Sequence, residues 1–77
     1  MRRFYFDIHD GHRTSRDDEG VHFPSLEAGR AALMIALGEV TKDVMPGGLN
    51  NAIVGEIRDQ TGRPIVRATL SLRVESL

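Results

Sequence analysis

Residues 3–11, RFYFDIHDG, set the first element of the expected fold, because apolar and polar side chains alternate along them until Asp-Gly. The apolar members Phe4, Phe6 and Ile8 alternate with Arg3, Tyr5, Asp7 and His9. A period of two residues is typical of a β-strand that buries one face. Asp-Gly is a strong hairpin signal, because both turn positions favour residues that accept positive φ. The stretch therefore predicts a strand followed at once by a tight turn.

Residues 12–23 are expected to return along this first strand. The segment HRTSR, residues 12–16, is polar, which is typical of a sheet edge where charged side chains discourage further pairing. The segment DDEG, residues 17–20, predicts a second turn, and VHF, residues 21–23, predicts a short extended piece before Pro24. We therefore expect a first hairpin over residues 2–23.

The middle of the chain predicts one amphipathic helix over residues 25–45. Ser25 is a suitable N-cap, and Glu27 places a negative charge in the first turn, where the helix dipole favours it. Apolar residues then recur at helical spacing, at Leu26, Leu33, Ala36, Leu37, Val40 and Val44. The helix is expected to end near Met45, because Pro46 disfavours helical geometry in the residue before it and Gly47-Gly48 follow.

Residues 51–75 predict a second hairpin. Ile53, Gly55 and Ile57 share one face of its first strand, and the segment DQTGR, residues 59–63, makes the turn with Gly62 in the left-handed position. The second strand alternates most regularly, with apolar side chains at Val66, Ala68, Leu70, Leu72 and Val74. This pattern favours a half-buried strand that continues to residue 74.

The expected fold is a single α+β domain over residues 1–77 with the order ββαββ. It has two layers, a four-stranded, mostly antiparallel sheet and one helix lying on one face. The expected core consists of the apolar residues that point between the layers, which are Phe4, Phe6, Ile8, Leu26, Leu33, Leu37, Val40, Ile57, Leu70 and Leu72.

Size and composition narrow the functions worth testing. A chain of 77 residues buries only about 60% of its unfolded surface, so a self-association interface is a reasonable source of further stability. No cysteine is present, which excludes disulfides and thiolate metal sites. Ten Lys and Arg against eleven Asp and Glu suggest no nucleic-acid or membrane partner from bulk charge. The start MRRFYFDIHD has no apolar run typical of a signal or a membrane span, and a cytoplasmic protein is expected.

The histidines and acidic residues near the first turn raise the question of a metal site. His9 and His12 flank the turn, and His22 lies further along. Two imidazoles form an incomplete site, because zinc usually takes three or four protein ligands. The segment also lacks the ligand spacing of a calcium-binding EF-hand loop. The turn interpretation is therefore favoured, and no metal is expected.

Catalysis is not indicated either. Adjacent acids in a turn such as DDEG are usually solvated, whereas catalytic pairs sit in clefts that shift their pKa values. No nucleophile elbow, phosphate-binding loop, dinucleotide fingerprint or His-Glu-x-x-His motif occurs. We expect a protein that is not an enzyme and needs no cofactor.

The sheet face away from the helix is the more promising surface. It is expected to present to solvent Tyr5, Val54, Glu56, Arg58, Ile65, Arg67, Thr69, Ser71 and Arg73. Arg58, Arg67 and Arg73 beside Tyr5 would suit weak nucleic-acid binding, but sheet-based RNA readers use two or three aromatics. Cross-strand Glu–Arg pairing is the alternative for these charges. The same face, with Val54 and Ile65, could instead pair with its own copy in a twofold dimer.

Met34 and Ile35 form a second apolar surface, on the helix. Ile35 points away from the stripe centred on Leu33, Leu37 and Val40, and Met34 lies at its margin. Together with the neighbouring Gly38, they suggest association through the side of the helix.

Three segments, RRFYFDIHDG (2–11), RDDEGVHFPSLEAGRAAL (16–33) and EIRDQTGRPIVRATLSLRVE (56–75), resemble a known family. It consists of short stand-alone bacterial proteins, common in rhizobia and related alphaproteobacteria, and is described only as a domain of unknown function. Its pattern of an aromatic start ending in Asp-Gly, an Asp-x-x-Gly turn, a Leu-Glu-Ala helix opening and an Arg-Asp-x-x-Gly-Arg-Pro hairpin matches Tyr5–Gly11, Asp17–Gly20, Leu26–Ala28 and Ile57–Pro64.

The resemblance spans essentially the whole chain and implies the ββαββ layout without implying an activity. Ile35 departs from the pattern, which implies a polar or charged residue there, and His12 and His22 are not part of it.

The sequence thus favours a small, uncharacterised interaction or accessory protein that acts through its open sheet face or as a homodimer. The candidate surface comprises Tyr5, Val54, Arg58, Ile65, Arg67 and Arg73 on the sheet, with Met34 and Ile35 on the helix. An unidentified protein partner is possible under this interpretation, a membrane is not expected, and weak nucleic-acid binding is the alternative.

Overall fold

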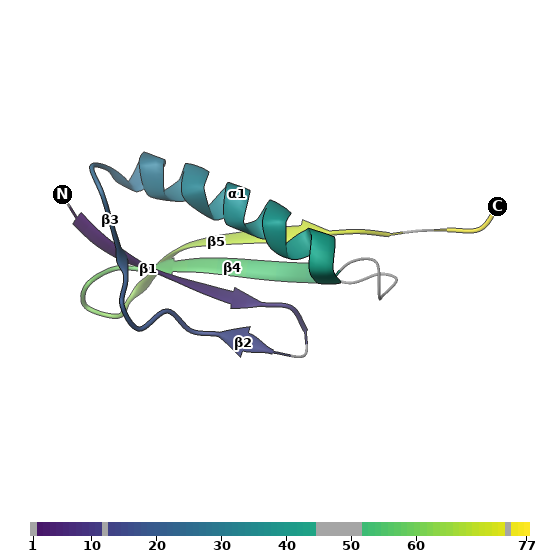
Figure 1. The fold of residues 1–77 in the computed structure, drawn as a ribbon, viewed down its shortest axis with the longest axis horizontal. Helices are drawn as coiled ribbons and strands as arrows, with labels where there is room; N and C mark the ends of the chain where they lie inside the picture. The colour runs from purple at the N-terminus through teal and green to yellow at the C-terminus, as the bar shows by residue number, and fades with distance from the viewer. Residues whose placement is uncertain (1, 12, 45–51, 74) are drawn as a thin grey trace.

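A computed structural model describes residues 2–11, 13–44, 52–73 and 75–77 of the chain (Figure 1). Its elements follow in the order β1 (Arg2–His9), β2 (Thr14–Ser15), β3 (Val21–Phe23), α1 (Leu26–Val44), β4 (Ala52–Arg58) and β5 (Pro64–Ser71). One helix lies on one face of an antiparallel sheet, so the expected α+β class and two-layer arrangement are confirmed.

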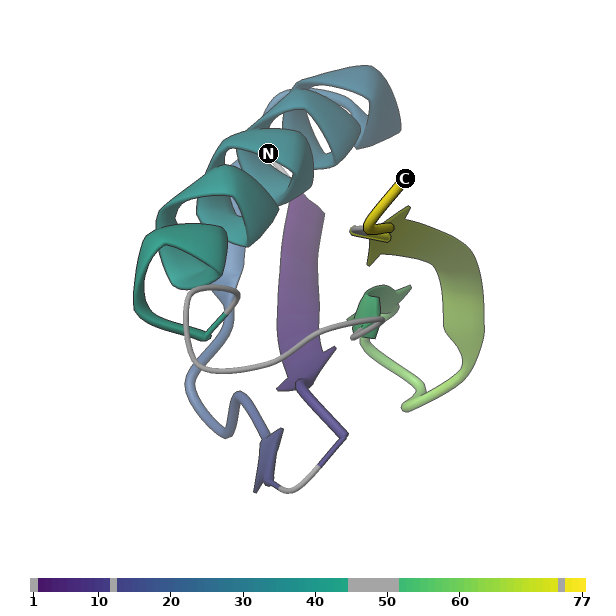
Figure 2. The same ribbon diagram turned by 90° about the vertical axis from the view of Figure 1, so that its right-hand side faces the viewer.

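The sheet has the strand order β2-β1-β4-β5, and β3 also pairs with β1. The sheet has one short strand more than the four expected, because β3, the extended piece predicted at residues 21–23, also pairs with β1. The turn predicted at residues 17–20 separates it from β2. Ile8 and His9 pair with β2, whereas Arg2, Arg3 and Phe4 pair with β3. Seen end-on, the sheet curls so that β5 forms the edge opposite β2 and β3 (Figure 2).

The core lies between α1 and the inner strands. Phe4, Leu33, Leu37, Ile53 and Ile57 are its buried members, and the expected core residues Phe6, Ile8, Leu26 and Val40 pack against it while partly exposed. Ile53 is fully buried although it was missing from the expected core. The Ser25 hydroxyl accepts a hydrogen bond from the backbone N–H of Ala28 at 3.2 Å, which confirms the predicted N-cap.

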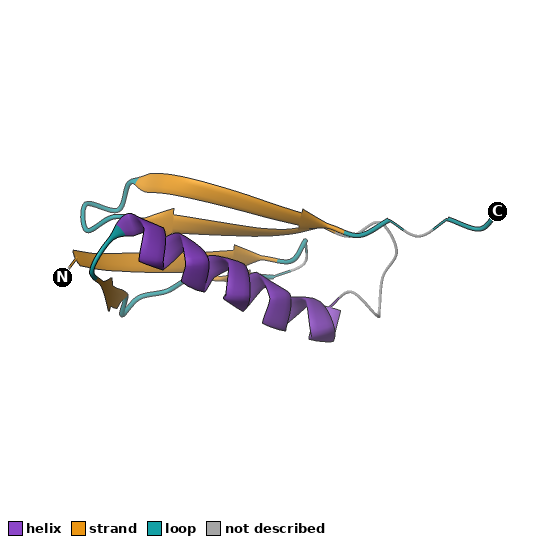
Figure 3. Ribbon diagram, turned by 90° about the horizontal axis from the view of Figure 1, so that it is seen from above, coloured by secondary structure: helices purple, strands orange, loops and turns teal. Residues whose placement is uncertain are grey.

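The end of the second hairpin differs from the expectation. β5 ends at Ser71 rather than continuing to residue 74, and Leu70 and Leu72, expected in the core, are 38% and 40% exposed. From above, α1 lies toward the β1 side of the sheet and β5 runs beyond it (Figure 3). A single helix is too narrow to cover four strands, so the apolar face of the outermost strand keeps partial exposure.

Two boundaries expected from the sequence, Met45 at the end of the helix and Asn51 at the start of the second hairpin, lie outside the described residues. The turn of that hairpin is as predicted. The backbone N–H of Asp59 donates to the carbonyl of Arg63 at 2.9 Å, and Gly62 has a φ of 88°.

Gly55 sets how closely α1 approaches the sheet. A Cβ added at Gly55 would lie 2.7 Å from Leu33 Cδ1 and 3.1 Å from Leu37 Cδ2, whereas a Cβ at Gly38 on the helix would meet nothing within 4 Å.

We expect Gly55→Ala to lower the free energy of unfolding by about 1–3 kcal/mol through overpacking. The matched variant Gly38→Ala should raise it by up to about 1 kcal/mol through helix propensity. Urea unfolding followed by circular dichroism measures both, and equal effects would contradict this packing.

Candidate interaction surface

The open face of the sheet, opposite α1, is organised by a buried ion pair between β1 and β4. Arg58 Nε lies 2.6 Å from Asp7 Oδ2, and Arg58 Nη2 lies 3.1 Å from Asp7 Oδ1. Asp7 is 6% exposed and Arg58 is 8% exposed. The guanidinium of Arg58 also stacks 5.1 Å from the centre of the Tyr5 ring. The expectation that Arg58 faces solvent is therefore wrong, because a carboxylate and an aromatic ring enclose it.

Asp17 joins this pair to the turn that separates β2 from β3. Its backbone N–H donates to Asp7 Oδ1 at 3.0 Å, and its carbonyl accepts from Arg58 Nη2 at 2.7 Å. Its carboxylate accepts from the backbone N–H of Phe6 at 3.1 Å. A backbone donor of β1 is thus satisfied by a side chain at the point where the return strand is interrupted. We call Asp7, Asp17 and Arg58 the polar clamp.

The clamp changes the acid–base behaviour of its two carboxyl groups. The hydrogen bonds from Arg58 lower the pKa of Asp7 and outweigh the opposing effect of burial. Burial raises the pKa of Asp17, but hydrogen bonds from the backbone N–H groups of Gly20, Phe6 and Glu19 bring the net pKa below its usual value. Asp7 also raises the pKa of Arg58 by hydrogen bonding to it. All three groups are therefore held in their charged forms.

The turn at residues 17–20 also covers part of the open face. Gly20 has a φ of 78°, and a Cβ there would lie 2.8 Å from Arg3 Cγ and 3.0 Å from Tyr5 Cε2. Tyr5 is half-buried beneath this turn rather than presented for stacking. The part of the open face around Tyr5 is thus less accessible than the sequence suggested, because the turn at residues 17–20 covers it.

The other two arginines of the candidate surface also have carboxylate partners. Arg67 Nη2 lies 2.6 Å from Glu56 Oε2 across the β4–β5 ladder, and Arg73 Nε lies 2.8 Å from Glu75 Oε1. The Glu56–Arg67 pair is the cross-strand pairing that was the alternative for these charges, whereas Arg73 and Glu75 pair locally beyond the end of β5. Val54 is half-buried on the same face.

Four of the exposed apolar side chains lie on or near the outer strand: Ile65 and Leu70 are on β5, Leu72 follows its end and Met34 is on α1, whereas the exposed Val21 lies on β3 at the other edge. Met34, Ile65, Leu70 and Leu72 are 63%, 36%, 38% and 40% exposed, and we call them the β5 rim. Ile35 is 69% exposed, which confirms that it points away from the core stripe. It follows Met34 by one residue and so lies about 100° further around the helix. The structure thus distinguishes a charge-paired open face from the β5 rim, which combines Ile65 of the expected sheet surface with Met34 of the expected helix surface.

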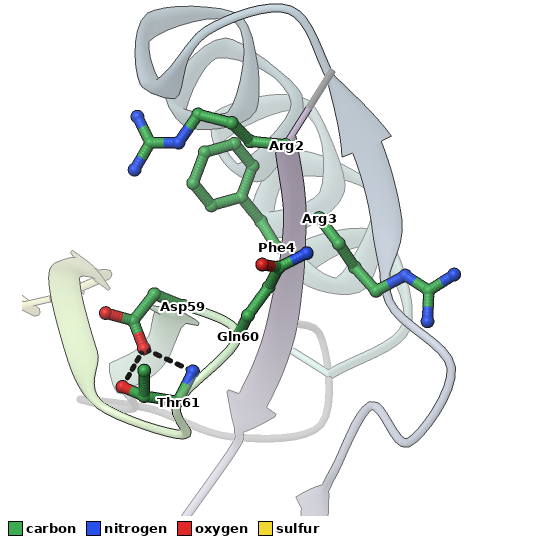
Figure 4. A pocket seen from close by; sticks show the side chains of 6 residues that line it. All are labelled: Arg2, Arg3, Phe4, Asp59, Gln60 and Thr61. Atoms are coloured by element: carbon green, nitrogen blue, oxygen red, sulfur yellow. Dashed lines mark hydrogen bonds between the residues drawn. The ribbon is translucent and has the colours of Figure 1, made fainter.

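The described surface has shallow depressions only of modest size. One of about 220 Å³ lies between the start of β1 and the β4–β5 turn and is lined by Arg2, Arg3, Phe4, Asp59, Gln60 and Thr61 (Figure 4). Arg2 and Arg3 point to opposite sides of β1, so they do not converge on a ligand. Hydrogen bonds from Thr61 lower the pKa of Asp59, whose carboxylate accepts from the Thr61 hydroxyl at 2.5 Å and from the Arg63 N–H at 3.1 Å. This carboxylate therefore shapes the turn.

The histidines lie apart among the described residues. His9 Nδ1 lies 2.9 Å from the Thr14 hydroxyl, and His22 pairs with Arg3 in the β1–β3 ladder. His12 lies outside the described residues. Within the described ranges, no three His, Asp or Glu side chains are grouped so that they could hold a metal ion. No helix in the same part of the chain is long and apolar enough to cross a membrane.

The chain is thus a small α+β protein with one helix on an antiparallel sheet. The model of the domain of unknown function DUF6894 matches residues 3–71, and the chain belongs to this family. The predicted membership of a family without assigned function is thereby confirmed, while its bacterial distribution and residue pattern stay predictions. No curated protein and no solved structure matches the chain.

The clamp predicts an asymmetric response to substitution. Arg58→Met should lower the free energy of unfolding by about 3–5 kcal/mol, because Asp7 would remain buried without its partner. The double variant Asp7→Leu/Arg58→Met should regain most of this loss, because no charge remains buried without a partner. The control Arg73→Met breaks an exposed pair and should change the free energy of unfolding by less than about 1 kcal/mol. Denaturant unfolding measures all three. Equal losses in Arg58→Met and Arg73→Met would contradict the buried pair.

The clamp also predicts how stability depends on pH. The folded-state pKa values of Asp7 and Asp17 are lowered, so the folded chain binds fewer protons than the unfolded chain in the acid range. Their contribution is fully present above the unfolded pKa of about 3.9 and is lost as the pH falls through the folded values. The urea concentration at the midpoint of unfolding should therefore decrease as the pH is lowered below about 4. Asp7→Asn should show a shallower fall, and an acid slope identical to that of the unchanged chain would contradict the assignment.

Proposed function

We propose that this protein is a small, non-enzymatic interaction module that acts in the cytoplasm, with the β5 rim as its contact surface. The observation that carries the proposal is the exposure of four large apolar side chains on and beside the outer strand: Ile65 and Leu70 on β5, Leu72 just after it and Met34 on the adjoining α1. Met34 lies beside Val66 and Ala68 of β5 around one depression, so part of this apolar surface is shared by the two elements. Contiguous apolar surface marks binding sites more often than scattered exposed residues do.

The open face supports the proposal less well than the rim. Its central charges are bonded to one another within the chain, in the Asp7–Arg58 and Glu56–Arg67 pairs. A partner docking there would have to displace or desolvate these pairs, which lowers the net gain from contact. The rim carries no such pairs and offers apolar area together with a strand edge.

The non-enzymatic part of the proposal rests on two observations. The described depressions have volumes of about 220, 240 and 280 Å³, below the roughly 300–1,000 Å³ of typical ligand sites. The carboxylates with shifted pKa values, those of Asp7, Asp17 and Asp59, are all committed to hydrogen bonds that hold the fold. These hydrogen bonds account for the shifted pKa values without requiring a catalytic role for the three carboxylates.

The experiment is a pull-down from native lysate with the tagged chain and matched surface variants. Leu70→Lys places a charge on the rim, and Ile35→Lys places the same charge on the outer surface of α1. We expect a bound protein that is lost with Leu70→Lys and retained with Ile35→Lys, because only the rim is used. Circular dichroism must first show that both variants are folded. Retention of every partner by the folded Leu70→Lys variant would overturn the proposal.

Weak nucleic-acid binding through Arg58, Arg67 and Arg73 is the alternative, and the same pull-down tests it. The variant Arg67→Gln/Arg73→Gln removes the two exposed charges and leaves the buried Arg58 in place. Nucleic acid recovered at low salt with the unchanged chain, lost with this variant and released as salt increases, would favour the alternative.

A further inference from the structure

β5 is an open edge of the sheet. Within the described residues it pairs with β4 on one side, whereas the corresponding edge of β1 is covered by β2 and β3. Pro64 and the register shift opposite Ile57 and Arg58 interrupt only the beginning of β5. From Val66 to Ser71 the outer backbone N–H and C=O groups are those of a regular strand, which is a template for pairing with another strand.

A depression of about 280 Å³ runs between α1 and this edge. Its apolar lining comes from Ala31, Leu33, Met34, Val66 and Ala68, and Arg30 and Arg67 also line it. The small side chains Ala31 and Ala68 leave the space that larger residues would fill. The same face of β5 carries Leu70, which has the period-two pattern of a core residue and yet is 38% exposed. An apolar hollow and an apolar side chain without cover thus lie two residues apart on one strand.

Symmetry limits how β5 could pair with a second copy of itself. Directly opposite residues of an antiparallel pair point to the same face of the sheet. If both helices lie on the same side of a joined sheet, the twofold axis is perpendicular to the sheet and places one residue of β5 opposite its own copy. An axis at Arg67 would oppose two like charges. An axis at Thr69 would pair Val66 with Leu72, which lies beyond the end of β5. An axis at Ala68 pairs Val66 with Leu70 and Arg67 with Thr69, which uses the regular part of the strand without opposing charges.

We propose that two copies of this chain join their β5 edges antiparallel about a twofold axis through Ala68, so that Leu70 of each copy fills the depression between α1 and β5 of the other. The proposal deepens the proposed function, on which it rests, by naming a second copy as the occupant of the β5 rim.

The contacts in the fold agree with this axis. In the pairing, Leu70 of the second copy lies opposite Val66 and on the same face, and Val66 lines the depression. Met34 and Ala68 line it together, so the two copies of Met34 would close over the seam from both sides. Gly55, the ladder partner of Ala68, lies beneath Leu33 and Leu37, so the middle of α1 also lies at the level of the axis. Arg67 keeps its partner Glu56, since both lie on the opposite face.

The first test is the mass of the purified, unchanged chain in solution, measured by sedimentation as a function of concentration. We expect the mass to rise from 8.5 kDa toward twice that value as the concentration enters the high micromolar range. Leu70→Lys should remain monomeric under the same conditions, and Ile35→Lys should dimerise as the unchanged chain does. A strictly monomeric unchanged chain, or loss of the dimer in Ile35→Lys with retention in Leu70→Lys, would overturn the proposal.

The second test reports the register and uses the absence of cysteine from the chain. In the proposed pairing, the two Cα atoms of residue 68 face each other at about 4.5–5.5 Å, within the range of a disulfide. Ala68→Cys should therefore form a covalent dimer rapidly on mild oxidation. Ser71→Cys, whose two positions would lie about 20 Å apart, should not. Equal cross-linking of the two variants would overturn the axis.

The two proposals fail separately. A monomeric purified chain whose lysate partner still depends on Leu70 would overturn the second copy as occupant and leave the rim as the contact surface. If the lysate partner is retained by the folded Leu70→Lys variant and the purified chain is monomeric at every concentration, both the β5 rim as contact surface and the second copy as its occupant are overturned.

Discussion

The buried pair between Asp7 and Arg58 is the interaction on which the rest of the sheet depends. Its two hydrogen bonds, at 2.6 and 3.1 Å, join β1 to β4 across 51 residues of chain. A slip of one residue between these strands would turn one of the two side chains to the other face, where the apolar core lies. The buried charges would then lose their partners at a cost of several kcal/mol. The pair therefore opposes any other register of β1 against β4.

The same pair accounts for the irregular edge beside β1. Arg58 also binds the carbonyl of Asp17, and Asp7 accepts a hydrogen bond from the backbone of Asp17. These bonds draw the turn at residues 17–20 over the open face and divide the return strand into β2 and β3. The Asp17 carboxylate then occupies the place of the missing strand residue by accepting the N–H of Phe6. One edge of the sheet is thus closed by side-chain chemistry.

The opposite edge has no such closure, and the reason is the width of one helix. α1 covers the sheet over Phe4, Ile53 and Ile57, which are buried, and leaves β5 partly uncovered. The residues of the two expected surfaces, the open sheet face and the side of the helix, are therefore grouped differently in the structure. Arg58 and Arg67 lie on the open face, where both are already paired with carboxylates, whereas Ile65 and Leu70 lie on β5 and Met34 lies on the adjoining flank of α1. This asymmetry directs attention from the open face to the β5 rim.

Several features could be predicted from local pattern alone. The alternation of Phe4, Phe6 and Ile8 predicted β1, the N-cap at Ser25 and the apolar spacing predicted α1, and Gly62 marked the turn of the second hairpin. These features depend on residues close together in the chain, where side-chain periodicity and backbone preference act directly. The exposure of Ile35 could be predicted for the same reason, because it follows from helical geometry.

The candidate site depended on strand order, which no local pattern contains. Asp7 resembled one more polar residue on a solvated face, and only the pairing of β1 with β4 brought Arg58 beside it. Leu70 and Leu72 had the pattern of core residues, but their exposure depends on which strand is outermost and how far α1 reaches. The sequence by itself determined the elements and their buried faces, because these follow from short-range periodicity. The tertiary structure alone decided which charges are buried together and which apolar side chains lack cover, because both depend on contacts between distant parts of the chain.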